Sequence, residues 1–162
     1  MADVQLLSVP NLPRVSSSSA AGDSYLPVVS ADGRFLLFAS TASNLTPGTS
    51  NIIALSPVPL KMNVYCRDRS NATTTLVSVN LFGTGANDDC TPIAMSTNGQ
   101  FALFESSASD LVPGDTNGVS DVFVRDLVAG NTILVSVNTN GTTANGASSD
   151  SVMTPDGRFV AF

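Results

Sequence analysis

Short hydrophobic runs separated by polar turns make up most of this chain. The clearest pair is residues 91–96 and 100–106, which flank Asn98 and Gly99. An Asn-Gly pair between two short apolar runs is typical of a β-hairpin with a type I′ turn, in which both central residues have positive φ. We therefore predict a hairpin over residues 91–106.

Two further strands are predicted after this hairpin. Residues 121–126 place Val122 and Val124 on one face of a strand and Phe123 on the other, and residues 132–138 form another strand after a polar turn. Before these strands, residues 107–113 combine Ser and Asp with Pro113, which predicts a short helical turn or a loop. No helical pattern extends beyond one turn, so we expect an all-β fold built from antiparallel strands.

The hydrophobic pattern repeats along the chain. Phe35 recurs as Phe101 and Phe159, at separations of 66 and 58 residues, and the segment 76–79 recurs after 58 residues. The longer first separation is explained by an insertion at residues 52–62, which is rich in Pro and apolar residues. Repeats of this length are typical of solenoids, propellers and arrays, and four antiparallel strands per repeat indicate the blade of a β-propeller.

The repeat organises the chain, residues 1–162, as a single partial β-propeller of about two and a half blades. Closed propellers have about four to eight blades, so one copy is expected to leave apolar blade faces and strand edges uncovered. We therefore expect either a homo-oligomer, in which copies complete one another, or a fragment of a longer propeller. The predicted parts are an orphan outer strand at 4–9, a first blade at 25–79 with the insertion at 52–62, a second blade at 91–138 and the inner hairpin of a third blade at 151–162.

Composition narrows the possible functions. Only 12% of the residues are charged, the net charge is −6 and there is no histidine. The negative charge argues against binding to nucleic acid or to an anionic membrane, and no apolar run is long enough to span a bilayer. Without histidine, His-based catalysis and His-ligated zinc are excluded. Cys66 and Cys90 are either two separate semi-buried thiols or one disulfide bridge.

The repeated motifs resemble those of a known family. An Asp-Gly or Asn-Gly pair followed by Arg or Gln and then Phe occurs at 32–35, 98–101 and 156–159. The blocks Ala-Ser-Asp-Leu, Pro-Gly-Asp-Thr-Asn-Gly and Asp-Val-Phe-Val-Arg-Asp lie within 108–126. These motifs resemble the TolB-type, WD-like propeller repeats of bacterial periplasmic and secreted proteins. The resemblance implies a β-propeller fold and a periplasmic or secreted location, while no signal peptide is visible in the sequence.

Asp115, Asn117 and Asp121 are the best candidates for a functional site. Oxygen-bearing side chains at alternate positions, with Gly118 in the turn and a later carboxylate, suit a loop that wraps a calcium ion. The same residues also suit an Asx-rich turn, whose side chains cap backbone groups. The matching positions of the first blade lack both carboxylates. We therefore predict a candidate calcium loop at these three residues, with the Asx-rich turn as the alternative.

Asp88 and Asp89 form a second candidate, for ligand binding. They lie in the connection to an inner strand, and such connections lie near the central channel of a propeller, where a ligand or metal can bind. The alternative is that both carboxylates simply face solvent. By contrast, the Arg-Asp pairs at 67–68 and 125–126 recur in each full blade, which indicates a repeated ion pair or a turn-capping carboxylate and not a catalytic group.

The function we expect is that of a non-catalytic scaffold or binding module with a protein or a carbohydrate as its ligand. The many serines lack a histidine base, and Lys61 lies in the insertion, so no catalytic residue is predicted. Calcium is the one cofactor expected, and the expected partners are the ligand and further copies of the chain. The alternative is a propeller domain of a larger extracytoplasmic hydrolase or lyase whose catalytic domain lies elsewhere.

Overall fold

The computed structural model describes residues 22–42, 44–46 and 60–162, and these residues form ten strands and no helix. The predicted strand at 4–9 and most of the insertion at 52–62 lie outside the described residues. Within the described ranges, no helix has the length and hydrophobicity needed to cross a membrane.

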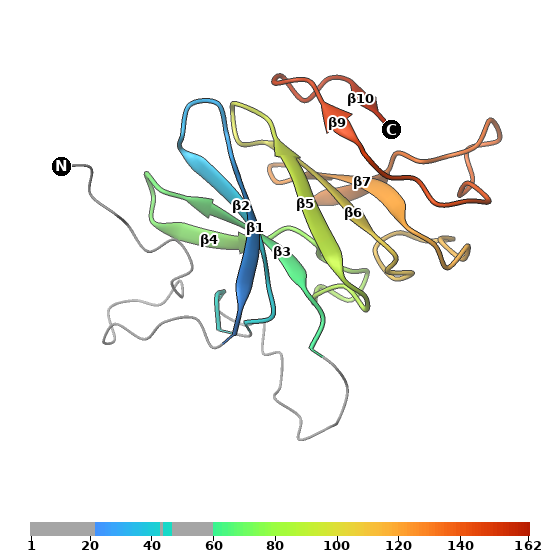
Figure 1. The fold of residues 1–162 in the computed structure, drawn as a ribbon, viewed down its shortest axis with the longest axis horizontal. Coiled ribbons are helices and arrows are strands. Elements are labelled where there is room, and N and C mark those ends of the chain that lie inside the picture. Colours follow the sequence, from blue (N-terminus) through green and yellow to red (C-terminus); the bar gives the residue numbers. More distant parts are fainter. Residues whose placement is uncertain (1–21, 43, 47–59) are drawn as a thin grey trace.

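The strands form two four-stranded sheets and one short hairpin (Figure 1). Every pair of neighbouring strands is antiparallel, and the strands of each sheet follow one another in chain order. The prediction of an all-β fold with four-stranded propeller blades is therefore confirmed. The first blade consists of β1 (Ser24–Val29), β2 (Phe35–Ser40), β3 (Asn63–Asp68) and β4 (Thr73–Leu76); the second consists of β5 (Cys90–Met95), β6 (Phe101–Ser106), β7 (Asp121–Asp126) and β8 (Asn131–Leu134); and the third hairpin consists of β9 (Val152–Met153) and β10 (Val160–Ala161).

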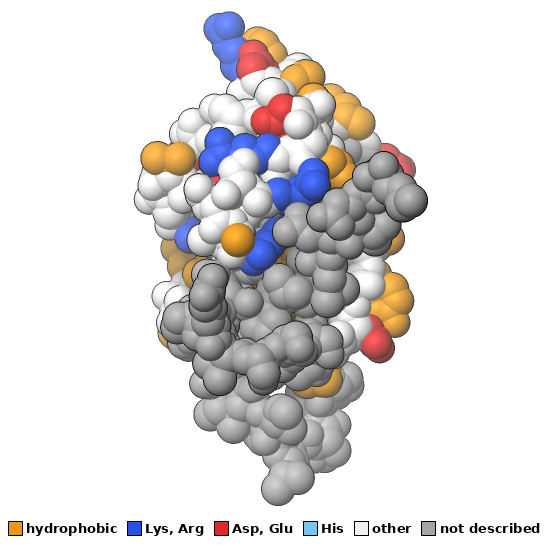
Figure 2. Space-filling model, turned by 90° about the vertical axis from the view of Figure 1, so that its left-hand side faces the viewer, with side chains coloured by type: hydrophobic (Ala, Val, Ile, Leu, Met, Phe, Trp, Pro, Cys, Tyr) orange, Lys and Arg blue, Asp and Glu red, His pale blue; other side chains and the backbone are white. Residues whose placement is uncertain are grey.

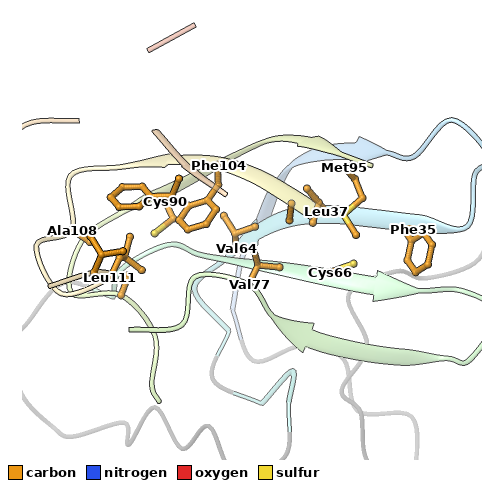
Figure 3. Close-up of a cluster of buried hydrophobic side chains, with 14 residues drawn as sticks. Phe35, Leu37, Val64, Cys66, Val77, Cys90, Met95, Phe104, Ala108 and Leu111 are labelled. Carbon is orange, nitrogen blue, oxygen red and sulfur yellow. The ribbon is translucent and has the colours of Figure 1, made fainter. Parts of the chain in front are cut away.

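Strand β2 is buried along its whole length because both of its faces are covered. Neighbouring residues of a strand point to opposite faces of the sheet. Phe35 and Leu37 pack with Phe104 of the second blade in one core, part of which is drawn in Figure 3, whereas Leu36 and Phe38 belong to a core on the other face. The unbroken apolar sequence of β2 thus follows from its position between two covered faces.

The same arrangement recurs one blade later. Leu103 and Val122 of the second blade pack with Met153 and Val160 of the third hairpin. Strand β5 contacts both β1 and β9, so the first strands of the three units lie next to one another, as the inner strands of a propeller do. Each blade therefore offers one apolar face to the blade that follows it in the chain.

The hairpin at 91–106 is present, but its turn is not the predicted type I′. Of the two residues expected to have positive φ, only Gly99 does, at 75°. The backbone N–H of Gly99 donates to the carbonyl of Ser96 at 2.9 Å, and the Asn98 side chain accepts from the backbone N–H of Gln100 at 3.1 Å. Because the side chain of Asn98 stabilises the turn in this way, glycine alone occupies the left-handed region.

Cys66 and Cys90 are free and buried, so the disulfide alternative is wrong. The two residues lie on different blades, and both belong to the core between those blades. Burial raises the pKa of each thiol to about 12. Both thiols therefore stay protonated at neutral pH and are poor nucleophiles.

Candidate functional site

One end of the sheets carries both of the sites predicted from the sequence. At this end β2 and β6 finish and β3, β5 and β7 begin. We call it the loop end, and it contains the connections 77–89, 107–120 and 135–150. Residues 107–113 form a loop with turns and without an assigned helix, and Leu111 is buried in the core between the blades. The tight turns after β1, β5 and β9 lie at the opposite end.

Asp121 lies at the centre of a buried hydrogen-bond network. Its side chain is fully buried, and its two carboxylate oxygens accept from the Ser136 hydroxyl and from the Asn117 amide, each at 2.6 Å. The Asn117 amide also donates to the carbonyl of Ala144 at 3.0 Å, and its oxygen accepts from the backbone N–H of Val119 at 3.1 Å. These contacts fix the start of β7 to the connections on either side of it.

Asp115 lies close enough to Asp121 for their charges to interact. Burial and the charge of Asp121 both raise the pKa of Asp115, against a smaller lowering by the backbone N–H of Asn117. The structure thus brings all three predicted ligands together. The site supplies two carboxylates and one amide. It therefore does not count among groups of three or more His, Cys, Asp or Glu side chains that could hold a metal ion, and the described residues contain no such group. Calcium binding here remains a prediction.

The network around Asp121 has a counterpart in the first blade. Asn63 occupies the position of Asp121, and its side-chain oxygen accepts from the Ser78 hydroxyl at 2.7 Å and from the backbone N–H of Ala86 at 2.8 Å. The Ser78 hydroxyl accepts from the backbone N–H of Val64, and the Ser136 hydroxyl accepts from that of Val122, both at 3.0 Å. An uncharged residue fills the position in one blade, so the network serves the blade structure in both.

Asp88 and Asp89 attach their connection to the start of β3. The Lys61 ammonium and the Asp88 carboxylate are 2.6 Å apart, and Asp89 accepts from the backbone N–H of Met62 at 2.8 Å. The hydrogen bond with Lys61 lowers the pKa of Asp88 and raises that of Lys61. Both carboxylates are thus engaged within the chain, and Asp88 keeps partial access to solvent.

The repeated Arg-Asp pairs are structural, as predicted, and the aspartate acts as a turn cap. Asp68 accepts from the backbone N–H of Ser70 at 2.9 Å and pairs with Arg34 at 2.7 Å. Asp126 accepts from the backbone N–H of Val128 at 2.9 Å. The arginine before each aspartate donates instead to a threonine of the outer strand. The two full blades therefore share this arrangement.

A tight turn at residues 80–84 is the feature of the loop end that the sequence analysis missed. The Asn80 side-chain oxygen accepts from the backbone N–H groups of Phe82 at 3.0 Å and Thr84 at 2.9 Å. Its amide donates to the Asp110 carboxylate at 2.7 Å, and the backbone N–H of Leu81 donates to the Asp110 carbonyl at 2.9 Å. The turn is thus fixed from within and is anchored to the second blade.

This turn presents two apolar side chains to solvent, which we call the apolar tip: Leu81, which is about half exposed, and Phe82, which is 82% exposed. The second blade forms the same turn around Asn138, and Thr139 and Asn140 occupy the two positions there. The apolar tip is therefore not required by the turn. A position-by-position comparison of the two repeats would have shown that apolar residues replace the polar Thr139 and Asn140 at these two positions, though not that they are exposed.

A hollow of about 270 Å³ lies beside the apolar tip. Gly83 of the turn, Val79 and residues of β4 line it on the first blade, and Arg125 lines it on the second blade. Figure 2 shows Lys and Arg side chains gathered on the side of the molecule that carries β4. The hollow therefore lies beside the turn that carries the apolar tip and is lined by both full blades.

No protein-family model matches the chain, and no curated protein matches it. Among solved structures, the crystal structure of TolB from Acinetobacter baumannii is similar over 88% of this chain, with 17% sequence identity and a TM-score of 0.47. The chain covers 26% of the length of that structure. The assignment of propeller blades therefore rests on the strand order and on the repeat.

Proposed function

We propose that this chain is a non-catalytic propeller-type binding module that holds a protein partner at its loop end. The observation that carries the proposal is the apolar tip, in which Leu81 and Phe82 are exposed on a turn held by Asn80 and Asp110. A fixed turn loses little conformational freedom on binding. Exposed aromatic side chains next to a hollow are frequent anchors of protein interfaces.

The polar groups of the described blades support a non-catalytic role. Asp121, Asp88 and Asp89 each hold a neighbouring segment through hydrogen bonds, and the two thiols are buried and protonated. These groups are thus committed to the fold. The alternative, that the blades belong to a larger hydrolase or lyase, would place catalysis in another domain and would leave the loop end as the surface that contacts it.

Replacing Leu81 and Phe82 with Thr and Asn together gives a direct test, because the second blade already uses these residues in the same turn. We expect the melting temperature to stay within error, since both side chains are exposed and no hydrogen bond of the turn uses them. Phage-displayed random peptides selected on the unchanged protein are expected to bind the double variant roughly tenfold or more weakly, the effect of removing an aromatic anchor.

Val128→Thr provides the matched control for this experiment. Val128 is also an exposed apolar side chain, but it lies in the turn after β7 at the opposite end of the sheet. Peptide binding should survive this change. The proposal is wrong if the selected peptides bind the double variant as tightly as the unchanged protein. If glycans on an array bind the unchanged protein but not the double variant, the ligand at the tip is a carbohydrate and not a protein.

Calcium at Asp115, Asn117 and Asp121 is a separate part of the proposal, supported by the proximity of two buried carboxylates. A ligand that binds only the folded state stabilises it, by about 2.7 kcal/mol at a concentration of 100 times Kd. We expect calcium to raise the melting temperature of the unchanged protein, and Asp115→Asn to remove this response.

The behaviour of Asp115→Asn in chelator gives the contrasting outcome. The raised pKa of Asp115 means that its ionisation destabilises the fold as the pH rises above the ordinary value of 3.8. Without calcium, Asp115→Asn should therefore raise the melting temperature at neutral pH, and less so in acid. If the unchanged protein does not respond to calcium or chelator, the residues form the Asx-rich turn alone.

Assembly between copies and an extracytoplasmic location complete the proposal. The location is carried by the resemblance of the repeats to those of periplasmic and secreted proteins. Assembly is supported by apolar side chains that the described blades leave exposed, among them Val29 and Phe159.

A further inference from the structure

A phenylalanine packs on a glycine at each contact between neighbouring blades. Phe35 lies over Gly99 so closely that a Cβ atom built on this glycine would be 2.1 Å from the ring Cζ. Phe101 lies over Gly157 in the same way, and there the distance to the ring Cδ2 would be 2.5 Å. The two phenylalanines occupy the same repeat position, and so do the two glycines. The ring of each blade thus lies against the turn of the next.

Phe159 is the third phenylalanine of this series, and its ring is uncovered. It is 62% exposed, and the Arg158 guanidinium lies 5.3 Å from the ring centre. Val152 beside it is also more than half exposed. Together they border a mostly apolar hollow of about 210 Å³ on the third hairpin. We call Val152 and Phe159, with this hollow, the trailing face.

Gly33 is the corresponding glycine of the first blade. Among the described residues, nothing lies within 4 Å of a Cβ atom built on Gly33, so no ring of these residues covers it. Leu26 and Val29 of β1 are about half exposed, whereas Pro92 and Met95, at the same positions of the second blade, are buried. We call Leu26, Val29 and Gly33 the leading edge.

We infer that the leading edge of one copy packs on the trailing face of a second copy, with the Phe159 ring over Gly33. This inference deepens the proposed assembly and rests on it for the presence of a second copy. The contact would repeat the part of the blade stacking that lies at β1 and the glycine turn, because Leu36 and Phe38, on the same face of β2, are already buried within the chain. Because two different surfaces meet, the copies join head to tail and form a ring or an open chain.

The chemistry of the two surfaces favours a second copy as the occupant. The contact inside the chain needs an aromatic ring on one side and an Asp-Gly or Asn-Gly turn on the other, and one chain exposes both. Asp156 stands next to Gly157 under Phe101, so the interface accepts the Asp-Gly pair that Asp32 and Gly33 present. The Asp32 carboxylate already accepts a hydrogen bond from the Ser30 hydroxyl at 2.6 Å. This bond would remain when the turn is covered, so the carboxylate would lose fewer hydrogen bonds to water.

Two charged variants test this inference by light scattering coupled to size exclusion. Val29→Glu places a charge on the leading edge, and Phe159→Asp places one on the trailing face. Both side chains are more than half exposed, so circular dichroism should be unchanged, and so should the melting temperature at a dilution where the unchanged protein is monomeric. We expect the unchanged protein to have a mass of two or more copies of the 16.6 kDa chain, and each variant alone to have the mass of one copy.

Mixing the two variants separates head-to-tail packing from other modes. The intact trailing face of Val29→Glu can still bind the intact leading edge of Phe159→Asp, so the mixture should recover a pair of copies. If the unchanged protein stays monomeric at every concentration, both the proposed assembly and this inference fail. If it assembles but the variants assemble equally well, or the mixture does not recover pairs, the inference fails and assembly uses another surface.

Discussion

Gly99→Ala is expected to lower the free energy of unfolding by about 2–4 kcal/mol. Alanine at φ +75° costs about 1 kcal/mol, because a side chain disfavours the left-handed region. The new methyl group would also meet the ring of Phe35, which is itself buried, and such overpacking costs about 1–3 kcal/mol. Urea unfolding monitored by circular dichroism measures the change.

Gly33→Ala is the matched control for Gly99→Ala. Gly33 has nearly the same backbone conformation, with φ +70°, but its Cβ position is open. The control should therefore lose only the conformational part, about 1 kcal/mol, when the protein is dilute enough to be monomeric. Equal losses in the two variants would mean that the Phe35 ring does not rest on the turn of the second blade.

Phe104→Ala is expected to be the most destabilising change, at about 3–5 kcal/mol. Phe104 is fully buried in the core between the first two blades, and its ring stacks on Phe123 with 5.5 Å between the ring centres. Removal of the ring leaves a cavity that the two rigid sheets cannot fill. The free energy of unfolding in urea is the quantity to compare.

Phe162→Ala tests whether that loss comes from packing between blades. Phe162 occupies the same repeat position as Phe104 but is 55% exposed, so its removal should cost roughly 1 kcal/mol or less. A small loss in both variants would contradict a packed core between the first and second blades. A large loss in both would mean that Phe162 is covered in solution.

The glycine turns and the apolar tip lie at opposite ends of the sheets. Strand β5 begins at the loop end and finishes at the Gly99 turn, so the two ends are separated by the length of a strand of 6 residues, about 20 Å. The blades stack through the glycine turns, and in the proposed assembly copies would stack there too. The apolar tip at Phe82 lies at the other end, so this assembly would leave it free for the proposed partner.

The strand pattern was predictable from sequence because it depends on local alternation and on the repeat. The hairpin at 91–106 and the strand at 121–126 both appear at the expected places. The type I′ turn was a wrong prediction because the Asn98 side chain bonds to its own turn, a competition that the dipeptide alone does not reveal. The contact of Phe35 with Gly99 joins residues far apart in the sequence and required the structure.

The candidate site was predicted only in part, for a similar reason. The sequence placed Asp115, Asn117 and Asp121 in one loop, but the burial of Asp121 by Ser136 depends on a distant strand connection. The apolar tip was missed because an exposed Phe82 and a buried phenylalanine look alike in a hydrophobic pattern. Its exposure follows from hydrogen bonds to the second blade, which no local pattern contains.

Nuclear Overhauser effects between phenylalanine rings and glycine α-protons test the central claim, that blades stack through rings on turn glycines, within the chain and between copies. We expect contacts from Phe35 to Gly99 and from Phe101 to Gly157 within one chain. In a mixture of labelled and unlabelled protein, we expect a contact from Phe159 of one copy to Gly33 of another. Missing contacts within the chain would contradict the blade stacking, and a missing contact between assembled copies would contradict its continuation.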